Sequence, residues 1–186
     1  MPVISRCLPE FKAVAQEPSR IFDDAMMHVL TFHLPAMVRL HAWKKLFAID
    51  RDGYSSLTFF DKLEDNEYTI VAIKDTKGYI FGAFCTEQWA TSSKFYGDGY
   101  SFVFTFRDGD DLEIYPATGE DELYQIADSD GIIIGGTNSS SSSKRAALSI
   151  FNHFGEGHSG ESVTYNNERL CGPSHLPDTV KTRDSN

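Results

Sequence analysis

The sequence predicts an α+β fold that is mainly β, in which short strands form a sandwich or a barrel beside short helices. Three observations carry this prediction. From residue 68 onward, short apolar runs alternate with turns rich in Gly and Asp. Phenylalanine recurs at two-residue spacing, the period of one strand face, at Phe102, Phe104 and Phe106. Two segments with helical periodicity precede these strands.

The first helix is predicted to begin after Ser19, which can act as its N-cap, and to end before Pro35. The residue before a proline avoids helical geometry, which sets that end. Asp23 and Asp24 lie near the first turn, where the helix dipole favours acidic side chains. The residues placed on one face at helical spacing are Phe22, Met26, Leu30 and His33.

The next segment is predicted to hold a strand, a turn and a second helix. Leu46–Ile49 is short and apolar and is expected to be the strand, with Asp50–Gly53 as the turn after it. Ser55 or Ser56 caps the second helix, which ends at the polar residues 64–67. The apolar face predicted for this helix consists of Leu57, Phe60 and Leu63.

The clearest hairpin joins Tyr68–Lys74 to Tyr79–Cys85 through a turn at residues 75–78. Gly78 is free to adopt the positive φ that such a turn needs. Three consecutive isoleucines between Gly131 and Gly135 fit a strand buried on both faces. The other predicted strands are Ser101–Phe106, Leu112–Tyr115 and Ala146–Ile150, and the last is a plausible partner of the isoleucine strand.

The chain is predicted to form one domain, because no internal repeat or second domain is found. Residues 1–17 are expected to be a flexible lead-in, 18–175 the domain and 176–186 a polar, flexible tail. Residues 135–145 contain five consecutive serines and are expected to form a mobile surface loop. Lys144 follows the serines, but the spacing is not the G-x-x-x-x-G-K-[ST] pattern of a phosphate-binding loop.

Composition excludes several classes of partner. The 186-residue chain is 41% hydrophobic and 24% charged, as in ordinary globular proteins. Its formal net charge of −10 disfavours nucleic acids and anionic membranes but suits a basic patch on a protein. No apolar run is long enough to span a bilayer. The cysteines Cys7, Cys85 and Cys171 are odd in number and scattered, which favours a reducing cytoplasm over a disulfide framework.

No residue pattern predicts catalysis or a metal site. His153 and His158 have a spacing that zinc sites use and His175 follows, but no C-x-x-C unit supplies further ligands. Ser159 lies in G-H-S-G-E, where a nucleophile elbow requires G-x-S-x-G. Cys85 ends an apolar strand, as expected of a buried small hydrophobe. The acidic turns lack the closing Glu of a calcium-binding loop, so turn geometry explains their Asp and Gly.

The aromatic-rich segment after the hairpin is the candidate partner-binding site. It contains E-Q-W and then K-F-Y-G-D-G-Y. Large aromatic side chains on an exposed loop can form a binding hot spot, although the glycines and the tryptophan also fit a structural loop. The candidate contact residues are Glu87, Trp89, Phe95, Tyr96, Asp98 and Tyr100. No catalytic, cofactor-binding or metal-binding residue is predicted.

Several motifs, taken in their order, resemble the TLDc domain of the oxidation-resistance protein family. The resemblance covers roughly residues 21–171. Two features differ: Tyr100 stands where the family has an acidic residue, and the closing L-E-V-W strand is absent. The matching motifs are D-G-Y-S-S-L at Asp52–Leu57, I-K-D-T-K-G-Y-I-F-G-A-F at Ile73–Phe84, F-Y-G-D-G at Phe95–Gly99 and I-I-I-G-G at residues 132–136.

This resemblance implies a two-sheet antiparallel β-sandwich flanked by short helices, without enzymatic activity or cofactors. Proteins with this domain are associated with protection from oxidative stress, and several bind the vacuolar proton-pumping ATPase. We therefore expect a cytoplasmic protein-interaction module that reaches organelle membranes only through a protein partner. The alternatives are a thiol-dependent antioxidant enzyme and a structural component of a cytoskeletal or ciliary assembly. The sequence leaves the oligomeric state open.

Overall fold

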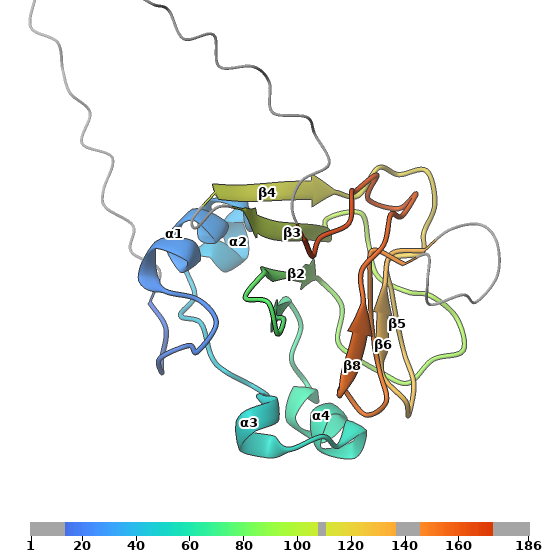
Figure 1. Ribbon diagram of the computed structural model, residues 1–186, viewed down its shortest axis with the longest axis horizontal. Helices are drawn as coiled ribbons and strands as arrows, with labels where there is room; N and C mark the ends of the chain where they lie inside the picture. The colour runs from blue at the N-terminus through green and yellow to red at the C-terminus, as the bar shows by residue number, and fades with distance from the viewer. Residues whose placement is uncertain (1–13, 108–110, 137–145, 173–186) are drawn as a thin grey trace, which may run out of the picture. The chain divides into compact units, whose positions relative to one another are not determined.

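The computed structural model describes residues 14–107, 111–136 and 146–172 (Figure 1). These residues belong to two compact units, one ending at Lys45 and one beginning at Leu46. Several predicted segments lie wholly or mostly outside the described residues: the lead-in, the tail, the serine-rich loop and the centre of the connection between the predicted strands Ser101–Phe106 and Leu112–Tyr115. Cys7 and His175 lie outside them too. The domain boundaries at 18 and 175 stay a prediction.

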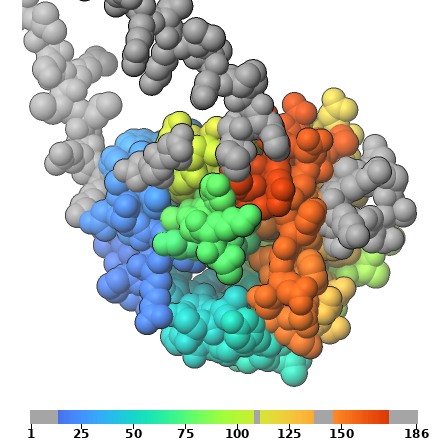
Figure 2. Space-filling model, viewed as in Figure 1, coloured from blue at the N-terminus to red at the C-terminus, as the bar shows by residue number. Residues whose placement is uncertain are grey.

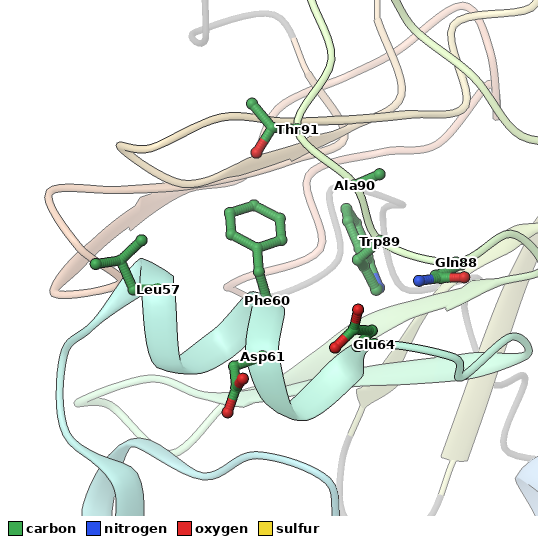
Figure 3. A pocket seen from close by; sticks show the side chains of 8 residues that line it. All are labelled: Leu57, Phe60, Asp61, Glu64, Gln88, Trp89, Ala90 and Thr91. Carbon is green, nitrogen blue, oxygen red and sulfur yellow. The ribbon is translucent and has the colours of Figure 1, made fainter.

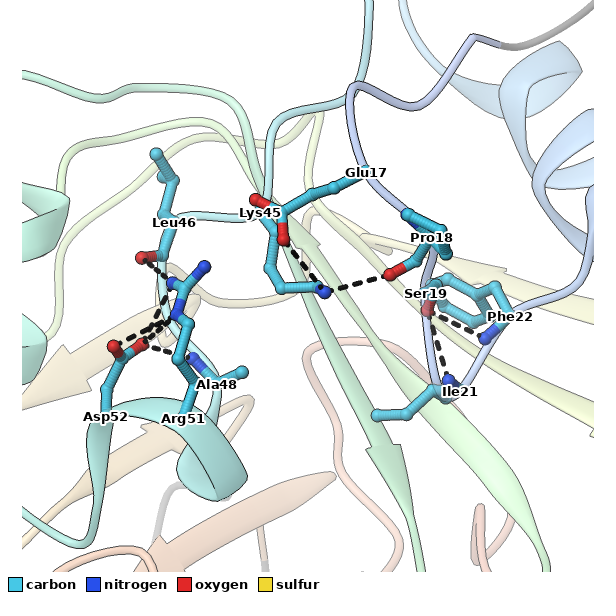
Figure 4. A network of polar contacts seen from close by, with 10 residues as sticks. All are labelled: Glu17, Pro18, Ser19, Ile21, Phe22, Lys45, Leu46, Ala48, Arg51 and Asp52. Atoms are coloured by element: carbon cyan, nitrogen blue, oxygen red, sulfur yellow. Dashed lines mark hydrogen bonds and ion pairs between the residues drawn. The ribbon is translucent and has the colours of Figure 1, made fainter.

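Helix α1 (Asp24–His33) begins one turn later than the sequence predicts. The Asp23 carboxylate accepts a hydrogen bond from the Met26 N–H at 2.8 Å, so Asp23 and not Ser19 is the N-cap. Ser19 Oγ instead accepts the backbone N–H groups two and three residues later (Figure 4). The predicted end before the proline is confirmed. The buried residues are Met26, Met27, Leu30 and Thr31, whereas His33 is exposed.

A second short helix and a β-bridge complete the first unit. Helix α2 (Ala36–Arg39) follows α1 after two residues. Ala15 and Trp43 form a parallel bridge that joins the two ends of the unit. The Lys45 ammonium donates to the Glu17 carboxylate at 3.2 Å and to the carbonyl of the following residue at 2.8 Å (Figure 4). The last residues of the first unit therefore contact the first described residues of that unit.

The second unit begins with helix α3 (Ile49–Asp52), where the sequence predicts a strand over 46–49 and then a turn. The strand prediction is wrong. The Asp52 carboxylate accepts the Ala48 N–H at 2.9 Å and pairs with the Arg51 guanidinium at 2.9 Å (Figure 4). A side-chain acceptor for this backbone N–H stabilises a helical turn, and a four-residue apolar run does not distinguish a strand from a helix.

Helix α4 (Ser56–Leu63) has the predicted cap but not the predicted buried face. Ser55 Oγ accepts the N–H of the residue three positions later at 3.3 Å. Leu57, which the sequence places on the apolar face, is 81% exposed. Phe60 is only partly buried. The side chains that face the interior are Ser56, Phe59 and Leu63.

The first sheet is a four-stranded antiparallel meander in the order β1-β2-β3-β4. Its first hairpin is confirmed, with the Asp75 carboxylate accepting two backbone N–H groups and Gly78 at φ 94°. The predicted spacing of phenylalanines is also confirmed, because neighbouring rings on one face lie 5.1–6.4 Å apart. The strands are β1 (Thr69–Lys74), β2 (Ile80–Cys85), β3 (Phe102–Arg107) and β4 (Asp111–Pro116).

The second sheet is another four-stranded antiparallel meander, in the order β5-β6-β7-β8. The isoleucine strand and its pairing with β7 are as predicted, whereas the sequence does not predict β5 or β8. The positive φ values of 52°, 52° and 66° at Asn152, His153 and Phe154 turn the chain from β7 into β8. The strands are β5 (Gln125–Ala127), β6 (Ile132–Ile134), β7 (Leu148–Phe151) and β8 (Glu156–His158).

The two sheets share one hydrophobic core, which confirms the mainly β sandwich. Their strands run crosswise in Figure 1, and α4 closes one end of the layers. Three aromatic rings meet at that end, with Phe59 centred 4.8 Å from Phe154 and 6.0 Å from Trp89. The side chains that the strands contribute include Phe81, Ala83, Cys85, Val103, Ala127, Ile132, Ile134 and Leu148.

The last described segment, at residues 169–172, accepts hydrogen bonds from side chains of β3. Thr105 Oγ1 donates to the Leu170 carbonyl at 2.8 Å. The Arg107 guanidinium donates to the carbonyls of Arg169 and Gly172, and its Nε pairs with a glutamate of β4 at 3.1 Å. This segment therefore covers the core without forming a strand of its own.

Replacing Gly82 in β2 by alanine is expected to destabilise the protein by about 1–3 kcal/mol, because the new methyl group has no room. Its Cβ would collide with the Val71 carbonyl oxygen and lie 2.9 Å from the Phe104 ring. Urea unfolding measures the effect. Gly99→Ala is the matched control, since that Cβ would meet one atom at an ordinary 3.6 Å. Equal midpoints for the two variants would contradict the packing described here.

Asp52→Asn is expected to lower the urea midpoint at pH 7. Hydrogen bonds from Arg51, and then from the Ala48 N–H and Lys62 of α4, hold the pKa of Asp52 well below its usual range. A depressed folded-state pKa adds stability above the unfolded value of about 4 and loses it as the pH falls further. The difference in urea midpoint between variant and wild type should therefore become smaller below about pH 4. A gap that stays constant, or one equally large for the exposed control Glu122→Gln, would refute the assignment.

Candidate functional site

The loop between β2 and β3, residues 86–101, is held in one conformation by hydrogen bonds to its own chain and to β5. Tyr96 forms an antiparallel bridge with Gln125, and its hydroxyl both donates to and accepts from the Ala90 backbone at 2.9 Å. Asp98 accepts the Thr86 hydroxyl at 2.8 Å. The loop is thus a preorganised surface that loses little conformational entropy on binding.

Trp89 anchors this loop in the core. Its side chain is 2% exposed, and its indole N–H donates to Thr69 Oγ1 of β1 at 2.9 Å. Its ring also packs edge-on against Phe59 of α4. Because one side chain contacts the first sheet and α4, the backbone on either side of Trp89 is fixed beside the helix.

A hollow of about 440 Å³ lies between α4 and this loop (Figure 3). Figure 3 shows side chains projecting from the helix on one side and from residues 88–91 on the other. The hollow is open to solvent, and the surface of α3 and α4 beside it adjoins that of residues near 155 in Figure 2. Its lining residues are Leu57, Phe60, Asp61, Glu64, Gln88, Trp89, Ala90 and Thr91.

The helix side of the hollow combines apolar and acidic groups. Leu57, Phe60, Asp61 and Glu64 recur at the spacing of a single helix face. Leu57, Asp61 and Glu64 are exposed, and Phe60 is partly buried against the core. Neither carboxylate forms an ion pair or a hydrogen bond within the described parts of the chain. This face therefore presents hydrocarbon and uncompensated negative charge together.

The structure gives the six predicted contact residues different positions. Glu87 and Tyr100 are exposed, the latter to 75%, and are available to a partner. Phe95, Tyr96 and Asp98 are partly buried, and the last two hold the loop together. Trp89 is in the core and borders the hollow from beneath. Whether these residues bind a partner stays a prediction.

The two described thiols differ in their exposure to solvent. Cys85 is completely buried, and desolvation raises the pKa of its thiol far above the usual range. Desolvation likewise raises the pKa of Tyr165, whose hydroxyl shares a hydrogen bond with Ser101 at 3.0 Å. Cys171 is partly exposed, and its sulfur accepts the Arg169 Nε–H at 3.2 Å.

Ser159 has a structural role. It is 2% exposed, donates to the Ala147 carbonyl at 2.9 Å and accepts the Leu170 N–H at 2.9 Å. With both bonds made to backbone groups, no described histidine activates it as a nucleophile. His153 and His158 are exposed, and no group of three or more possible metal ligands occurs among the described residues. No helix in this part of the chain is long and apolar enough to cross a membrane.

Of the six contact residues that the sequence predicts, only Trp89 lines the hollow, and no residue of the helix side is among them. The predicted apolar face of α4 places Leu57 inside, although its side chain is 81% exposed, and Phe60 is only partly buried. One signal was available: an inward face at 56, 59 and 63 leaves an acidic and apolar face at 57, 60, 61 and 64. Choosing between the two faces requires knowing where the sheets lie.

Comparison with known proteins gives a consistent family. The TLDc domain model matches residues 15–181. Oxidation resistance protein 1 of Xenopus laevis is 30% identical over 127 residues, which cover 68% of this chain and 15% of that protein. The human protein of the same name is 29% identical over the same length. MTOR-associated protein MEAK7 of Gallus gallus is 27% identical over 176 residues, covering 90% of this chain and 36% of that protein. The chain thus spans only a minor part of each relative.

Thr69→Val is expected to destabilise the protein by about 1–3 kcal/mol, because it leaves the buried indole N–H of Trp89 without an acceptor. Thr69→Ser is the matched control, since it keeps the hydroxyl and loses only a methyl group. Urea unfolding followed by tryptophan fluorescence measures both variants. If Thr69→Val unfolds at the same urea concentration as Thr69→Ser, this hydrogen bond does not anchor the loop.

Proposed function

The chain belongs to the TLDc domain family, and we propose that it is a non-enzymatic protein-interaction module that binds the vacuolar proton-pumping ATPase and contributes to oxidative stress resistance. The names of its oxidation resistance relatives support the second part. The pump is proposed because several members of the family bind it. The name of the MTOR-associated relative describes that protein by an association with another, which agrees with an interaction role.

One contrast within the structure carries the proposal. The described groups that could attack a substrate, such as Cys85 and Ser159, are buried and occupied by packing or hydrogen bonds. On α4 and directly after it, Leu57, Asp61 and Glu64 are instead exposed beside the hollow, and the two carboxylates form no ion pair within the described residues. Buried, fully bonded nucleophiles do not support catalysis, whereas a preorganised surface of mixed character suits protein recognition.

A thiol-dependent antioxidant activity is the second candidate, and one observation favours it. Cys171 is partly exposed and its sulfur contacts the Arg169 guanidinium, a group that can stabilise a thiolate. Such an activity would be lost when the cysteines are replaced. An interaction module would keep its function without them, so the two candidates make opposite predictions.

The test is copurification of proton-pump subunits with a tagged chain, comparing wild type with the triple variant Cys7→Ser, Cys85→Ala and Cys171→Ser. Pump subunits should be recovered with both proteins in amounts that agree within about twofold, because no thiol takes part in binding. Survival of peroxide-treated cells carrying either protein gives the second readout. Thermal unfolding confirms that the triple variant is folded, since Cys85→Ala removes one buried atom.

Two outcomes would overturn the proposal. Recovery of no pump subunit with folded wild-type protein would remove the pump as partner. Loss of peroxide protection in the folded triple variant, with unchanged recovery of the pump, would assign the protective function to thiol chemistry.

A further inference from the structure

We infer that the hollow between α4 and residues 88–91 binds a protein segment in which a large aliphatic or aromatic side chain is flanked by lysine or arginine. The inference rests on the proposed interaction function and names the chemistry of the partner and the residues that meet it. Its occupant follows from the two kinds of group that the hollow exposes.

The apolar part of the site consists of one exposed and one partly buried side chain of α4. Leu57 is 81% exposed at the end of the hollow, and Phe60 forms its wall one turn later (Figure 3). Behind them the core is rigid, because Phe60 packs against Phe59 with ring centroids 5.4 Å apart. A partner side chain placed here would remove exposed hydrocarbon from water on both surfaces, which is the main source of affinity in small interfaces.

The acidic part selects the charge of the partner. Asp61 and Glu64 border the same hollow, no lysine or arginine lines it, and neither carboxylate has an ion pair within the described chain. The neighbouring Lys62 is engaged with Asp52 at 3.3 Å and does not neutralise them. A cationic residue next to the partner's apolar side chain would therefore find two unpaired carboxylates within one helical turn.

The same charges disfavour other occupants. A second copy of this chain would bring its own Asp61 and Glu64 against these, in a molecule of net charge −10. Like charges placed together oppose association. An anionic membrane surface would meet the same repulsion. A basic and apolar protein segment is the occupant that both halves of the site favour.

The loop completes the site without needing to move. Gln88, Ala90 and Thr91 line the wall opposite α4, and the Trp89 and Tyr96 hydrogen bonds hold that wall in place. A wall that is already ordered binds with a smaller entropic cost than a flexible loop. The hollow is therefore a preformed site whose selectivity for a partner comes from its side chains.

A charge-swap experiment tests the inference with the whole chain. Two fluorescein-labelled amphipathic helical peptides serve as probes: one has a leucine face flanked by lysines, and the other has every lysine replaced by glutamate. Asp61→Lys with Glu64→Lys should weaken binding of the lysine peptide by about tenfold or more and allow binding of the glutamate peptide, because attraction and repulsion are exchanged. Fluorescence anisotropy measures both affinities.

The matched control is Glu120→Lys with Glu122→Lys, which changes two exposed acidic residues away from the hollow. Each replacement adds two charges, so both double variants go from −10 to −6. A general attraction to an acidic protein would weaken equally in both, and that result would overturn the inference. Leu57→Ser should also weaken binding of the lysine peptide, because it removes the exposed apolar side chain without adding a charge, whereas Leu40→Ser, at a leucine 74% exposed in the first unit, should not.

Two further outcomes separate this inference from the proposed function. If the Asp61 and Glu64 double variant still recovers pump subunits at the wild-type level, the pump binds elsewhere and the inference fails while the proposed function stands. If the wild-type chain dimerises in sedimentation and Leu57→Ser abolishes the dimer, a second copy is the occupant and the inference is overturned. Loss of pump subunits in the hollow variants alone supports both.

Discussion

The buried indole of Trp89 is the contact on which the candidate site depends. Its N–H donates a hydrogen bond to Thr69 of β1 and its ring lies against Phe59 of α4. One side chain of the loop therefore contacts both the sheet and the helix. A buried donor without an acceptor is costly, which makes this arrangement strongly preferred over alternatives. The hollow exists because the backbone on both sides of that indole must pass beside α4 at a fixed distance. The hollow is thus a consequence of how the core is closed.

Much of the fold could be predicted from local signals. The hairpin between β1 and β2 could be predicted because its turn residues and the apolar runs on either side of the turn indicate the same structure. By contrast, β5 (Q-I-A) and β8 (E-G-H) have three residues each, too few to show the two-residue period of a strand, so only their neighbours in the sheet define them. The apolar run at residues 46–49 does not become a strand, because the Asp52 carboxylate stabilises a helical turn beside it. Such decisions depend on side-chain hydrogen bonds that a hydrophobic pattern does not contain.

The candidate site was predictable only in part, for a related reason. The sequence marks residues 87–100 as aromatic and tightly turned, but it cannot say that Trp89 points inward while Tyr100 remains exposed. On α4 two apolar faces are possible, and the hydrophobic pattern favours burial of the larger one, which contains Leu57 and Phe60. The sheets bury Phe59 instead because its ring fits beside Trp89 and Phe154. Exposure of Leu57 is therefore decided by packing between elements far apart in the sequence.

The net charge of the chain and the fixed shape of the hollow have complementary effects on binding. The long-range field of a chain with net charge −10 can speed the approach of a basic partner, but it does not choose where that partner binds. The hollow beside α4 adds that choice, because there a partner's apolar side chain can contact the exposed Leu57 and the partly buried Phe60 together. The potential nucleophiles Cys85 and Ser159 are both buried, and Ser159 forms hydrogen bonds with two backbone groups. The packing that forms the hollow therefore also keeps these two side chains away from the surface.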